Sequence, residues 1–418
     1  MIGTGLFAVV SLCALAAPTL AKGKDAGVDM VATSWYAGYH ATDVPLSSIS
    51  WDKYTHMAFF VATTTDDSAQ LSTDMSNGTL LPEFVSLAHK HDVKAGISIG
   101  GWTGSIWFSS FTDSAANRTR FVNSVTDFVQ KYKLDYVDFD WEYPNRQGVG
   151  CNTINANDTA NFLAFLQELR QTKVGKKLII SAATSLFPWN DATGAPMTDA
   201  KPFADVFDFI EIMNYDVWGP WSASVGPNAP INDSCAAPAN QQGSAVAAVK
   251  AWTAAGMPTS KIVLGVPAYG HSFYVAPSNA FVANSTTTLA AYPPFNNSLA
   301  PHGDAWSGDD LLPTTDVCGN AVGIGGTFAF RGMVEGGFLT AAGDPASGIL
   351  SRFDDCSQTP YVYNASDGTM ISYDNAQSFR AKGNFIKQNK LRGFSMFETG
   401  GDFNNVLLDS ILEATGMK

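Results

Sequence analysis

Basic residues are scarce in this sequence of 418 residues. It contains 25 Lys and Arg against 38 Asp and Glu, which gives a formal net charge of −13, and its Lys and Arg form no block. Such a chain repels a phosphate backbone, so the charge argues against a nucleic-acid partner. A neutral or cationic partner fits this composition better.

Long apolar runs are also lacking. The run from Leu6 to Ala17 is too short for a membrane span, and no later segment reaches the roughly 18 apolar residues that a span needs. Small residues follow this run, and Thr19 and Ala21 are placed for cleavage by signal peptidase. We therefore expect residues 1–21 to be a signal peptide, the mature protein to be secreted, and the membrane not to be a partner.

Cysteine is rare, and no CxxC or His/Cys cluster with zinc spacing occurs, so we expect no metal and no cofactor. Removal of the signal would take Cys13 with it, and an even number of cysteines in a secreted chain suggests disulfides. Of the three pairings we favour those between sequence neighbours, Cys151 with Cys235 and Cys318 with Cys356. Secretion also agrees with seven N-x-S/T sequons, at Asn77, Asn117, Asn157, Asn232, Asn284, Asn296 and Asn364.

What the chain does contain is a regular alternation of short β-branched or aromatic runs with helical patterns. This alternation is typical of parallel strands joined by crossover helices, and eight such units predict a (β/α)8 TIM barrel of the α/β class. The helical spacing is clear in residues 121–132 and 162–169. The predicted strands are Val31–Tyr39, His56–Ala62, Lys94–Ile99, Tyr136–Trp141, Leu178–Ala183, Phe209–Asn214, Ile262–Pro267 and Gly393–Glu398.

The alternation is interrupted once, between the seventh and eighth predicted strands. Residues 273–373 are rich in Pro, Gly, Asn and Ser, and a structureless loop of that length is improbable in a compact domain. We interpret them as a small α+β insertion domain, with residues 22–272 and 374–418 forming the barrel. The barrel resumes with a helix predicted at 375–388.

Residues 134–144, "LDYVDFDWEYP", place an acid at every second position between large apolar residues. In a strand, side chains alternate between faces, so Asp138, Asp140 and Glu142 would share the face that points into the barrel. Glu142 would lie at the C-terminal end of the strand, where barrel enzymes carry their active sites, and Pro144 would close the strand.

Three carboxylates this close cannot all stay ionised in a poorly solvated interior, so at least one should hold a proton near neutral pH. Cleavage of an acetal such as a glycosidic bond needs a proton donor for the leaving oxygen and negative charge near the cation-like carbon. The acidic strand predicts a site with both.

Two simpler interpretations of this strand are weaker. Asp-x-Asp-x-Glu could begin a calcium loop, but Tyr143 stands where such a loop needs Gly, and Val149 where it needs Glu. The acids could also be solvated residues of an edge strand. The apolar flanks and the central place of this strand in the series argue against that.

A serine hydrolase is a third alternative, because Gly96, Ser98 and Gly100 match the G-x-S-x-G pattern. That motif needs a helix directly after the serine, whereas Gly101, Trp102 and a turn-rich segment follow here. We expect instead that the glycines allow close approach of the backbone, and that Ser98 makes a hydrogen bond inside the barrel.

The stretch "DYVDFDWEYP" resembles the D-G-x-D-x-D-x-E signature of family 18 glycoside hydrolases, the chitinases and their relatives. Tyr136 stands where that signature usually has Gly. The insertion resembles the α+β subdomain of the deep-cleft subfamily, and the likeness extends from about Val31 to Leu412. Three further motifs resemble those of the family, and all four stand in the family's order along the chain: "SIGG" at 98–101 before the acidic strand, and "MNYD" at 213–216 and "LGVPAYG" at 264–270 after it.

The resemblance implies a role for each of these catalytic candidates. Glu142 would protonate the glycosidic oxygen, and the substrate's own 2-acetamido oxygen would be the nucleophile. Asp140 would orient the acetamide and offset the charge of the cyclic intermediate, while Asp138 holds or shares its proton. Tyr215 would hydrogen-bond the acetamide carbonyl, and Asp216 would contact the distorted sugar.

Met213 and Gly101 are substrate-binding candidates on the same motifs. The eighth strand departs from the family because Phe397 stands where a Trp usually forms the floor of the sugar site. A phenyl ring stacks with less area and has no indole N–H, so we expect weaker binding or altered preference but not loss of activity. Trp102 and Trp35 are candidates for further stacking surfaces, with core packing as the alternative for each.

Taken together, these features predict a secreted, monomeric chitinase that binds chitin or chitooligosaccharides and cleaves β-1,4-linked N-acetylglucosamine with retention of configuration. Two alternatives remain: a chitin-binding lectin on the same barrel, and an endo-β-N-acetylglucosaminidase that acts on N-glycans. The retained Asp140 and Glu142 argue against the lectin, and the insertion favours chitin over N-glycans.

Overall fold

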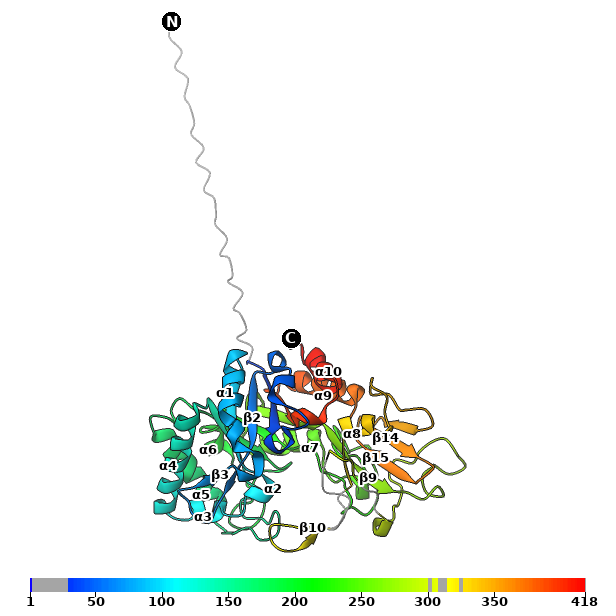
Figure 1. Cartoon of the computed structure of the whole chain (residues 1–418), viewed down its shortest axis with the longest axis horizontal. Coiled ribbons are helices and arrows are strands. Elements are labelled where there is room, and N and C mark those ends of the chain that lie inside the picture. Colours follow the sequence, from blue (N-terminus) through cyan, green and yellow to red (C-terminus); the bar gives the residue numbers. More distant parts are fainter. Residues whose placement is uncertain (2–28, 300–302, 307–313, 323–325, 418) are drawn as a thin grey trace.

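The computed structural model of the chain describes residue 1 and residues 29–299, 303–306, 314–322 and 326–417. Within these residues, eight parallel strands form a closed barrel in the order β1-β16-β8-β7-β6-β5-β4-β2, and a β1–β2 pairing closes the ring. This confirms the predicted (β/α)8 fold. The barrel occupies the left and centre of Figure 1, with the C-terminal helices at its top. The predicted signal peptide lies outside the described residues except for Met1.

Every predicted strand has an observed counterpart, with ends that differ by at most a few residues. The seventh, Ile262–Pro267, has the predicted bounds, whereas the sixth ends two residues early, at Ile212. The barrel strands are β1 (Val31–Ala37), β2 (His56–Thr64), β4 (Lys94–Gly100), β5 (Tyr136–Asp140), β6 (Ile179–Thr184), β7 (Phe209–Ile212), β8 (Ile262–Pro267) and β16 (Gly393–Phe397). A short strand, β3 (Leu71–Ser72), pairs antiparallel with the C-terminal end of β2.

The helices cover the outside of the barrel, and several begin at a side-chain cap that local sequence explains. Ser114 accepts a hydrogen bond from the backbone of Asn117, and Asn375 forms a reciprocal capping box with Ser378. The α-helices are α1 (Leu81–Lys90), α2 (Gly101–Gly104), α3 (Phe108–Thr112), α4 (Ala115–Tyr132), α5 (Asp158–Gln171), α6 (Lys201–Ala204), α7 (Ala245–Ala254), α8 (Phe330–Glu335), α9 (Ala376–Gln388) and α10 (Val406–Thr415).

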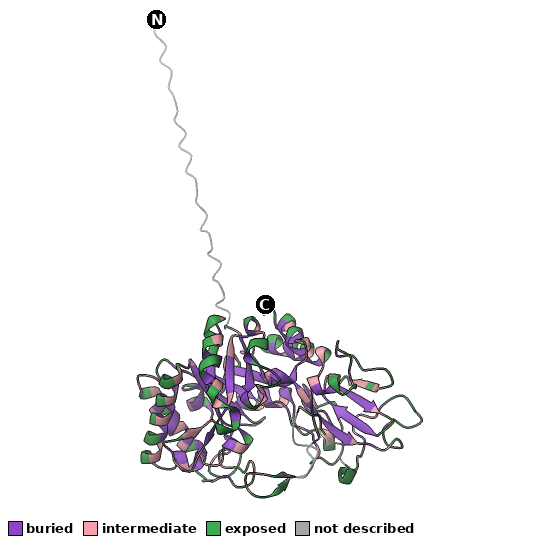
Figure 2. Cartoon of the chain, in the orientation of Figure 1, coloured by how far each residue is buried: buried purple, intermediate pink, exposed green. Residues whose placement is uncertain are grey.

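The main core lies between the barrel strands and these helices. Behind β5, the ring of Phe139 packs edge-on against Phe162 of α5 and Phe165 of the same helix, and Phe121 of α4 stacks on Phe165. Figure 2 shows the strands as buried and the outward helix faces as exposed. The outward-facing side chains of β5 therefore hold the strand in place, which leaves its inward side chains for chemistry.

The segment between β8 and β16 forms a second, antiparallel sheet, at the right in Figure 1. Its strands lie in the order β12-β9-β15-β14-β13, and a separate buried cluster that includes Phe273, Tyr361 and Tyr363 packs on it. Because β9 begins at Tyr269, this sheet starts four residues before the predicted start of the insertion; the domain boundaries stay a prediction. The strands are β9 (Tyr269–Tyr274), β12 (Thr327–Ala329), β13 (Leu350–Asp354), β14 (Thr359–Asn364) and β15 (Thr369–Ser372), and a separate pair is β10 (Thr314–Thr315) with β11 (Ala321–Val322).

The predicted disulfide pairing is wrong. Cys151 is bonded to Cys318, and Cys235 to Cys356, with Cα–Cα distances of 5.6 and 5.8 Å. Cys151 and Cys235 lie in the loops after β5 and β7, and their partners lie between β8 and β16. Each bond therefore joins a barrel loop to the inserted segment, because folding brings these loops together although they are distant in sequence.

Among the described residues, none of the helices has the length and apolar character that crossing a lipid bilayer would require.

Candidate active site

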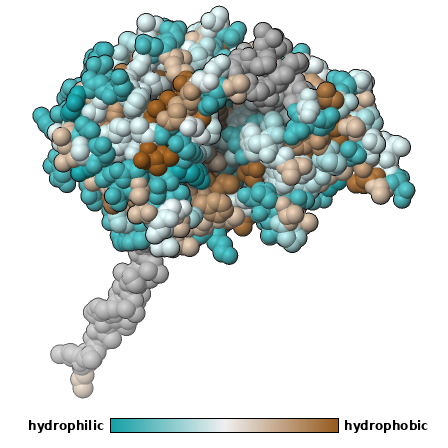
Figure 3. Space-filling model, turned by 90° about the horizontal axis from the view of Figure 1, so that it is seen from below, coloured by the Kyte–Doolittle hydropathy of each residue, from teal (hydrophilic) through white to brown (hydrophobic). Residues whose placement is uncertain are grey.

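The acidic strand lines the bottom of a cleft of about 610 Å³. Asp138 and Asp140 lie in β5 and are 0% and 4% exposed, and Glu142, 9% exposed, follows two residues after the strand ends. Asp140 and Glu142 line the cleft, whereas Asp138 lies beneath them. In the view from below, the molecular surface is hollowed near its middle, with apolar residues at the edge of the hollow (Figure 3).

Both carboxylate oxygens of Asp138 accept hydrogen bonds inside the barrel. The indole N–H of Trp35 and the hydroxyl of Ser98 donate to Oδ2 at 3.1 and 2.9 Å, and the hydroxyl of Ser181 donates to Oδ1 at 2.9 Å. The hydrogen bond predicted for Ser98 is therefore confirmed. These donors come from β1, β4 and β6, so three strands orient one carboxylate.

Asp140 and Glu142 have a different environment. Burial, and then the charges of Glu142 and Asp138, hold the pKa of Asp140 well above its usual value, and its Oδ1 has no hydrogen-bond partner among the described residues. Burial raises the pKa of Glu142 to about 7. A carboxyl group with this pKa is protonated through much of the neutral range and can act as a general acid.

The backbone around Glu142 is held by a serine and by tight packing of glycine. The hydroxyl of Ser105 donates to the carbonyl of Asp140 at 2.9 Å and accepts from the backbone N–H of Glu142 at 3.0 Å. Gly100 has a φ of +114°, and a Cβ at this position would lie 2.2 Å from the carbonyl oxygen of Asp140. The close approach expected of the glycines is therefore confirmed at Gly100.

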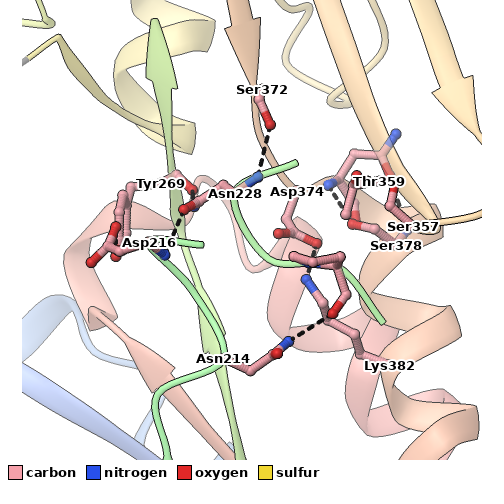
Figure 4. Close-up of polar contacts among 12 residues, drawn as sticks. Asn214, Asp216, Asn228, Tyr269, Ser357, Thr359, Ser372, Asp374, Ser378 and Lys382 are labelled. Atoms are coloured by element: carbon pink, nitrogen blue, oxygen red, sulfur yellow. Dashed lines mark hydrogen bonds and ion pairs between the residues drawn. The ribbon is translucent and has the colours of Figure 1, made fainter. Parts of the chain in front are cut away.

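Asp216 lies in the loop after β7 and is held by two residues of β9 and by Asn228. Oδ1 of Asp216 is 2.8 Å from the hydroxyl of Tyr269 and 2.7 Å from Nε2 of His271, both in β9. Asn228 accepts a hydrogen bond from the backbone N–H of Asp216 and donates to the carbonyl of Tyr269, and its own N–H donates to Ser372 in β15 (Figure 4). Asp216 is also among the residues that line the cleft.

The aromatic candidates differ in exposure. Trp102 is 52% exposed at the cleft, whereas Trp35 is 2% exposed and is engaged with Asp138. Phe397 lies between them in exposure, and its ring centroid is 5.8 Å from that of Trp35 and 5.3 Å from that of Phe60. Met213, Tyr215 and Gly101 also line the cleft. The structure thus brings every candidate residue to one cleft, with Asp138 just below its floor.

The sequence interpretation missed several polar residues of this site. Tyr269 stands inside the quoted "LGVPAYG" motif, and His271 follows it directly. Arg146 lines the cleft, and its guanidinium lies 3.9 Å from the ring centroid of Tyr143. Glu211 is buried in β7, and its alternation with Phe209 and Met213 is the signal that could have placed it inside the barrel.

The structure also bears on the serine-hydrolase alternative and on the unusual Tyr136. A short helix, α2, begins at Gly101, where the sequence predicts a turn-rich segment, but β4 continues through Ser98 to Gly100. Ser98 therefore lies inside a strand and not on the strand-to-helix turn that a serine hydrolase requires. The bulky Tyr136, in place of the usual Gly of the signature, faces Gly96 in the neighbouring strand, where a Cβ would lie 2.3 Å from the tyrosine ring. The glycine at position 96 therefore makes room for the tyrosine ring.

A closed parallel barrel with two carboxyl groups of raised pKa at the C-terminal end of β5 defines a glycoside hydrolase of the barrel class. The sequence pattern described as "Glycosyl hydrolases family 18" matches residues 32–402, and the chain belongs to this family.

Relatives in this family agree with that class. A protein of Moniliophthora roreri named "chitinase-like effector" is 52% identical over 93% of this chain and 93% of its own length. Chitinase A1 of Niallia circulans is 32% identical, with 77% of this chain and 42% of that protein aligned. The crystal structure of a chitinase from Rhizomucor miehei has a TM-score of 0.82 and 34% identity, over 92% of this chain and 99% of that one.

Proposed function

We propose that the chain is a secreted chitinase that hydrolyses β-1,4 linkages between N-acetylglucosamine units, with Glu142 as the general acid and base. The observation that carries this proposal is the Glu142 carboxyl group in the cleft beside Asp140, with a pKa raised to about 7 by burial. The names of the relatives support the substrate. The apolar start of the sequence and the two disulfides support secretion.

In this mechanism Glu142 gives its proton to the glycosidic oxygen as the bond to the anomeric carbon breaks. The 2-acetamido oxygen of the same sugar forms the new bond to that carbon, which retains the configuration after water attacks in the second step. Asp140 orients the acetamide N–H and Tyr215 donates a hydrogen bond to the acetamide carbonyl in this proposal, and both residues line the cleft. Ionised Glu142 then accepts a proton from the attacking water.

Glu142→Gln tests this assignment directly. An amide of the same shape has no proton of suitable acidity, so we expect the rate of chitin hexaose cleavage to fall by about 10²–10⁴-fold. Binding of the hexaose, measured by calorimetry, should change little. Glu413→Gln, on the exposed end of α10, is the matched control and should behave as the wild type. Wild-type turnover by Glu142→Gln would show that the proton comes from another group.

A second candidate is a protein that binds chitin fragments without cleaving them. It is favoured by two relatives named "chitinase-like effector", 52% and 48% identical, and by Phe397 at the floor of the site. The wild-type arm of the same assay separates the two functions, because hexaose that is bound but still intact after prolonged incubation supports the second. Mass spectrometry of the products from hexaose and from a glycoprotein separates chitin cleavage from N-glycan cleavage.

A further inference from the structure

A fourth acid lies inside the barrel, next to the three of β5. Glu211 is in β7, is 2% exposed, and pairs in register with Ala183 of β6 and Val263 of β8. Ala183 lies two residues after Ser181, the register partner of Asp138, so Glu211 and Asp138 project into the barrel from the same face of the sheet. There the carboxyl group of Glu211 is hydrogen-bonded to that of Asp138.

The position of the proton between Glu211 and Asp138 follows from their other partners. A hydrogen bond between two carboxyl groups requires that one of them hold a proton. Asp138 already accepts from Trp35, Ser98 and Ser181, and the indole N–H of Trp35 can only donate. The oxygens of Asp138 are therefore committed as acceptors, which places the proton on Glu211.

The surroundings of Glu211 lead to the same assignment. Its Oε2 has no hydrogen-bond partner among the described residues, and a buried charge without partners is costly. The groups that act on it are Asp138, Asp140 and the hydroxyl of Ser395. Burial, and then the charge of Asp138, hold the pKa of Glu211 well above its usual value.

We propose that Glu211 is a positioning residue of the active site: as the un-ionised acid it donates a hydrogen bond to Asp138 and keeps that carboxyl group oriented beneath Asp140. This rests on the proposed glycoside hydrolysis. Glu211 does not reach the cleft, since it is not among the residues that line it, so it acts on the substrate only through the acids of β5.

Two substitutions separate the hydrogen bond from the space that the side chain fills. Gln in Glu211→Gln has nearly the same shape and can donate an amide N–H to Asp138, so kcat should stay within about threefold of wild type and the pH profile should not move. Leu in Glu211→Leu fills the space without a donor. Its kcat on chitin hexaose should fall at least about tenfold at a KM within about threefold of wild type.

The pH profile is the readout that a purely structural role would not move. Glu211→Leu removes one hydrogen-bond donor from the group of buried acids, so the acid limb of its kcat profile should move up by about one pH unit. If Glu211→Leu has the kcat and the pH profile of the wild type, Glu211 only fills space and the proposal is wrong. Equal impairment of Glu211→Gln and Glu211→Leu, or a profile shift in Glu211→Gln, would show that Glu211 ionises in the working range and would overturn the proposal.

Infrared difference spectroscopy tests the protonation state without any turnover, and so remains decisive if the protein binds chitin but does not cleave it. At pH 6, the spectrum of wild type minus Glu211→Gln should show loss of a protonated carboxylic C=O band. Loss of carboxylate bands instead would contradict the proposal. Glu413→Gln, an exposed acid, serves as the control that loses carboxylate bands, and thermal unfolding verifies that each variant is folded.

Discussion

Phe397 is the residue whose chemistry departs furthest from what the sugar site of the family usually holds. Its ring lies within a group of aromatic residues, with centroids 5.8 Å from Trp35 and 6.3 Å from Tyr215. A side cavity of about 200 Å³ that also contacts Tyr39 and Trp306 adjoins it. The site therefore has a smaller aromatic floor than a Trp would give, and has space for a larger ring nearby.

Phe397→Trp should strengthen substrate binding. The added ring area and the indole N–H are expected to contribute about 0.5–1.5 kcal/mol, which corresponds to a KM lowered by roughly two- to tenfold for chitin hexaose. Steady-state kinetics measure this. The control is Phe353→Trp, on β13 away from the cleft. An unchanged or higher KM with an unchanged melting temperature would show that the phenyl ring does not floor the sugar site.

The sequence alone predicted the position of some site residues but not of others. The alternation of acids in residues 136–142 was sufficient to put Asp138 and Asp140 inside a barrel, because strand geometry is local. Glu211 is a single acid among apolar residues, and only the packing of β5, β6 and β7 brings it to Asp138. Its role depends on a contact between residues 73 positions apart, which no local pattern records.

At the scale of elements, the loop after β7 depends on the second sheet for its shape. Asp216 has a φ of +55°, a conformation that non-glycine residues rarely adopt. The fully buried Asn228 accepts a hydrogen bond from the backbone N–H of Asp216. Asn228 is in turn hydrogen-bonded to Tyr269 in β9 and to Ser372 in β15 (Figure 4). The orientation of Asp216 thus depends on how the antiparallel sheet packs on the barrel.

Asn228→Ala should loosen this connection. The backbone N–H of Asp216 and the carbonyl of Tyr269 would lose their hydrogen bonds, at a cost of roughly 1–3 kcal/mol in the free energy of unfolding, and kcat should fall by about tenfold as Asp216 loses its fixed position. Thermal unfolding and hexaose kinetics measure the two effects. Asn389→Ala, on the exposed end of α9, provides the comparison. If Asn228→Ala retains both wild-type melting temperature and kcat, Asp216 is positioned by Tyr269 and His271 alone.

The disulfides belong to the same scale. The sequence favours pairing between neighbours, because Cys318 and Cys356 lie in the same inserted segment. The observed bonds, Cys151–Cys318 and Cys235–Cys356, instead span 167 and 121 residues. Bonds across such long segments restrict the unfolded chain more than short-range bonds would, and each joins a barrel loop to the inserted segment.

At the scale of the whole molecule, several buried acids retain protons that the unfolded chain would release. Burial raises the pKa of Glu142 and of Glu398 to about 7, and that of Asp402 to about 6. Since the folded state binds more protons than the unfolded state between about pH 4.5 and 7, stability falls as pH rises through this window. His56 acts in the opposite direction, because burial lowers its pKa to about 4, but its effect is complete by about pH 6.5.

The melting temperature should therefore be lower at pH 8 than at pH 6.5. Each group with a folded pKa near 7 accounts for roughly 1 kcal/mol of this loss. Glu398→Gln removes one such group and should lose less stability between the two pH values than wild type does. Calorimetry at both values measures the difference. Equal losses in the two proteins would mean that Glu398 is already ionised at pH 6.5.

The sequence by itself determined the barrel and its acidic strand. Strand alternation and helical periodicity are local properties, and four short motifs in order are enough to identify the family. The cysteine pairing, the contacts of Asn228 and His271 with Asp216, and the fourth acid beside Asp138 were decided only by tertiary structure. Each of these is a contact between residues far apart in the chain, and its geometry exists only after the strands have closed into a ring and the second sheet has packed against it.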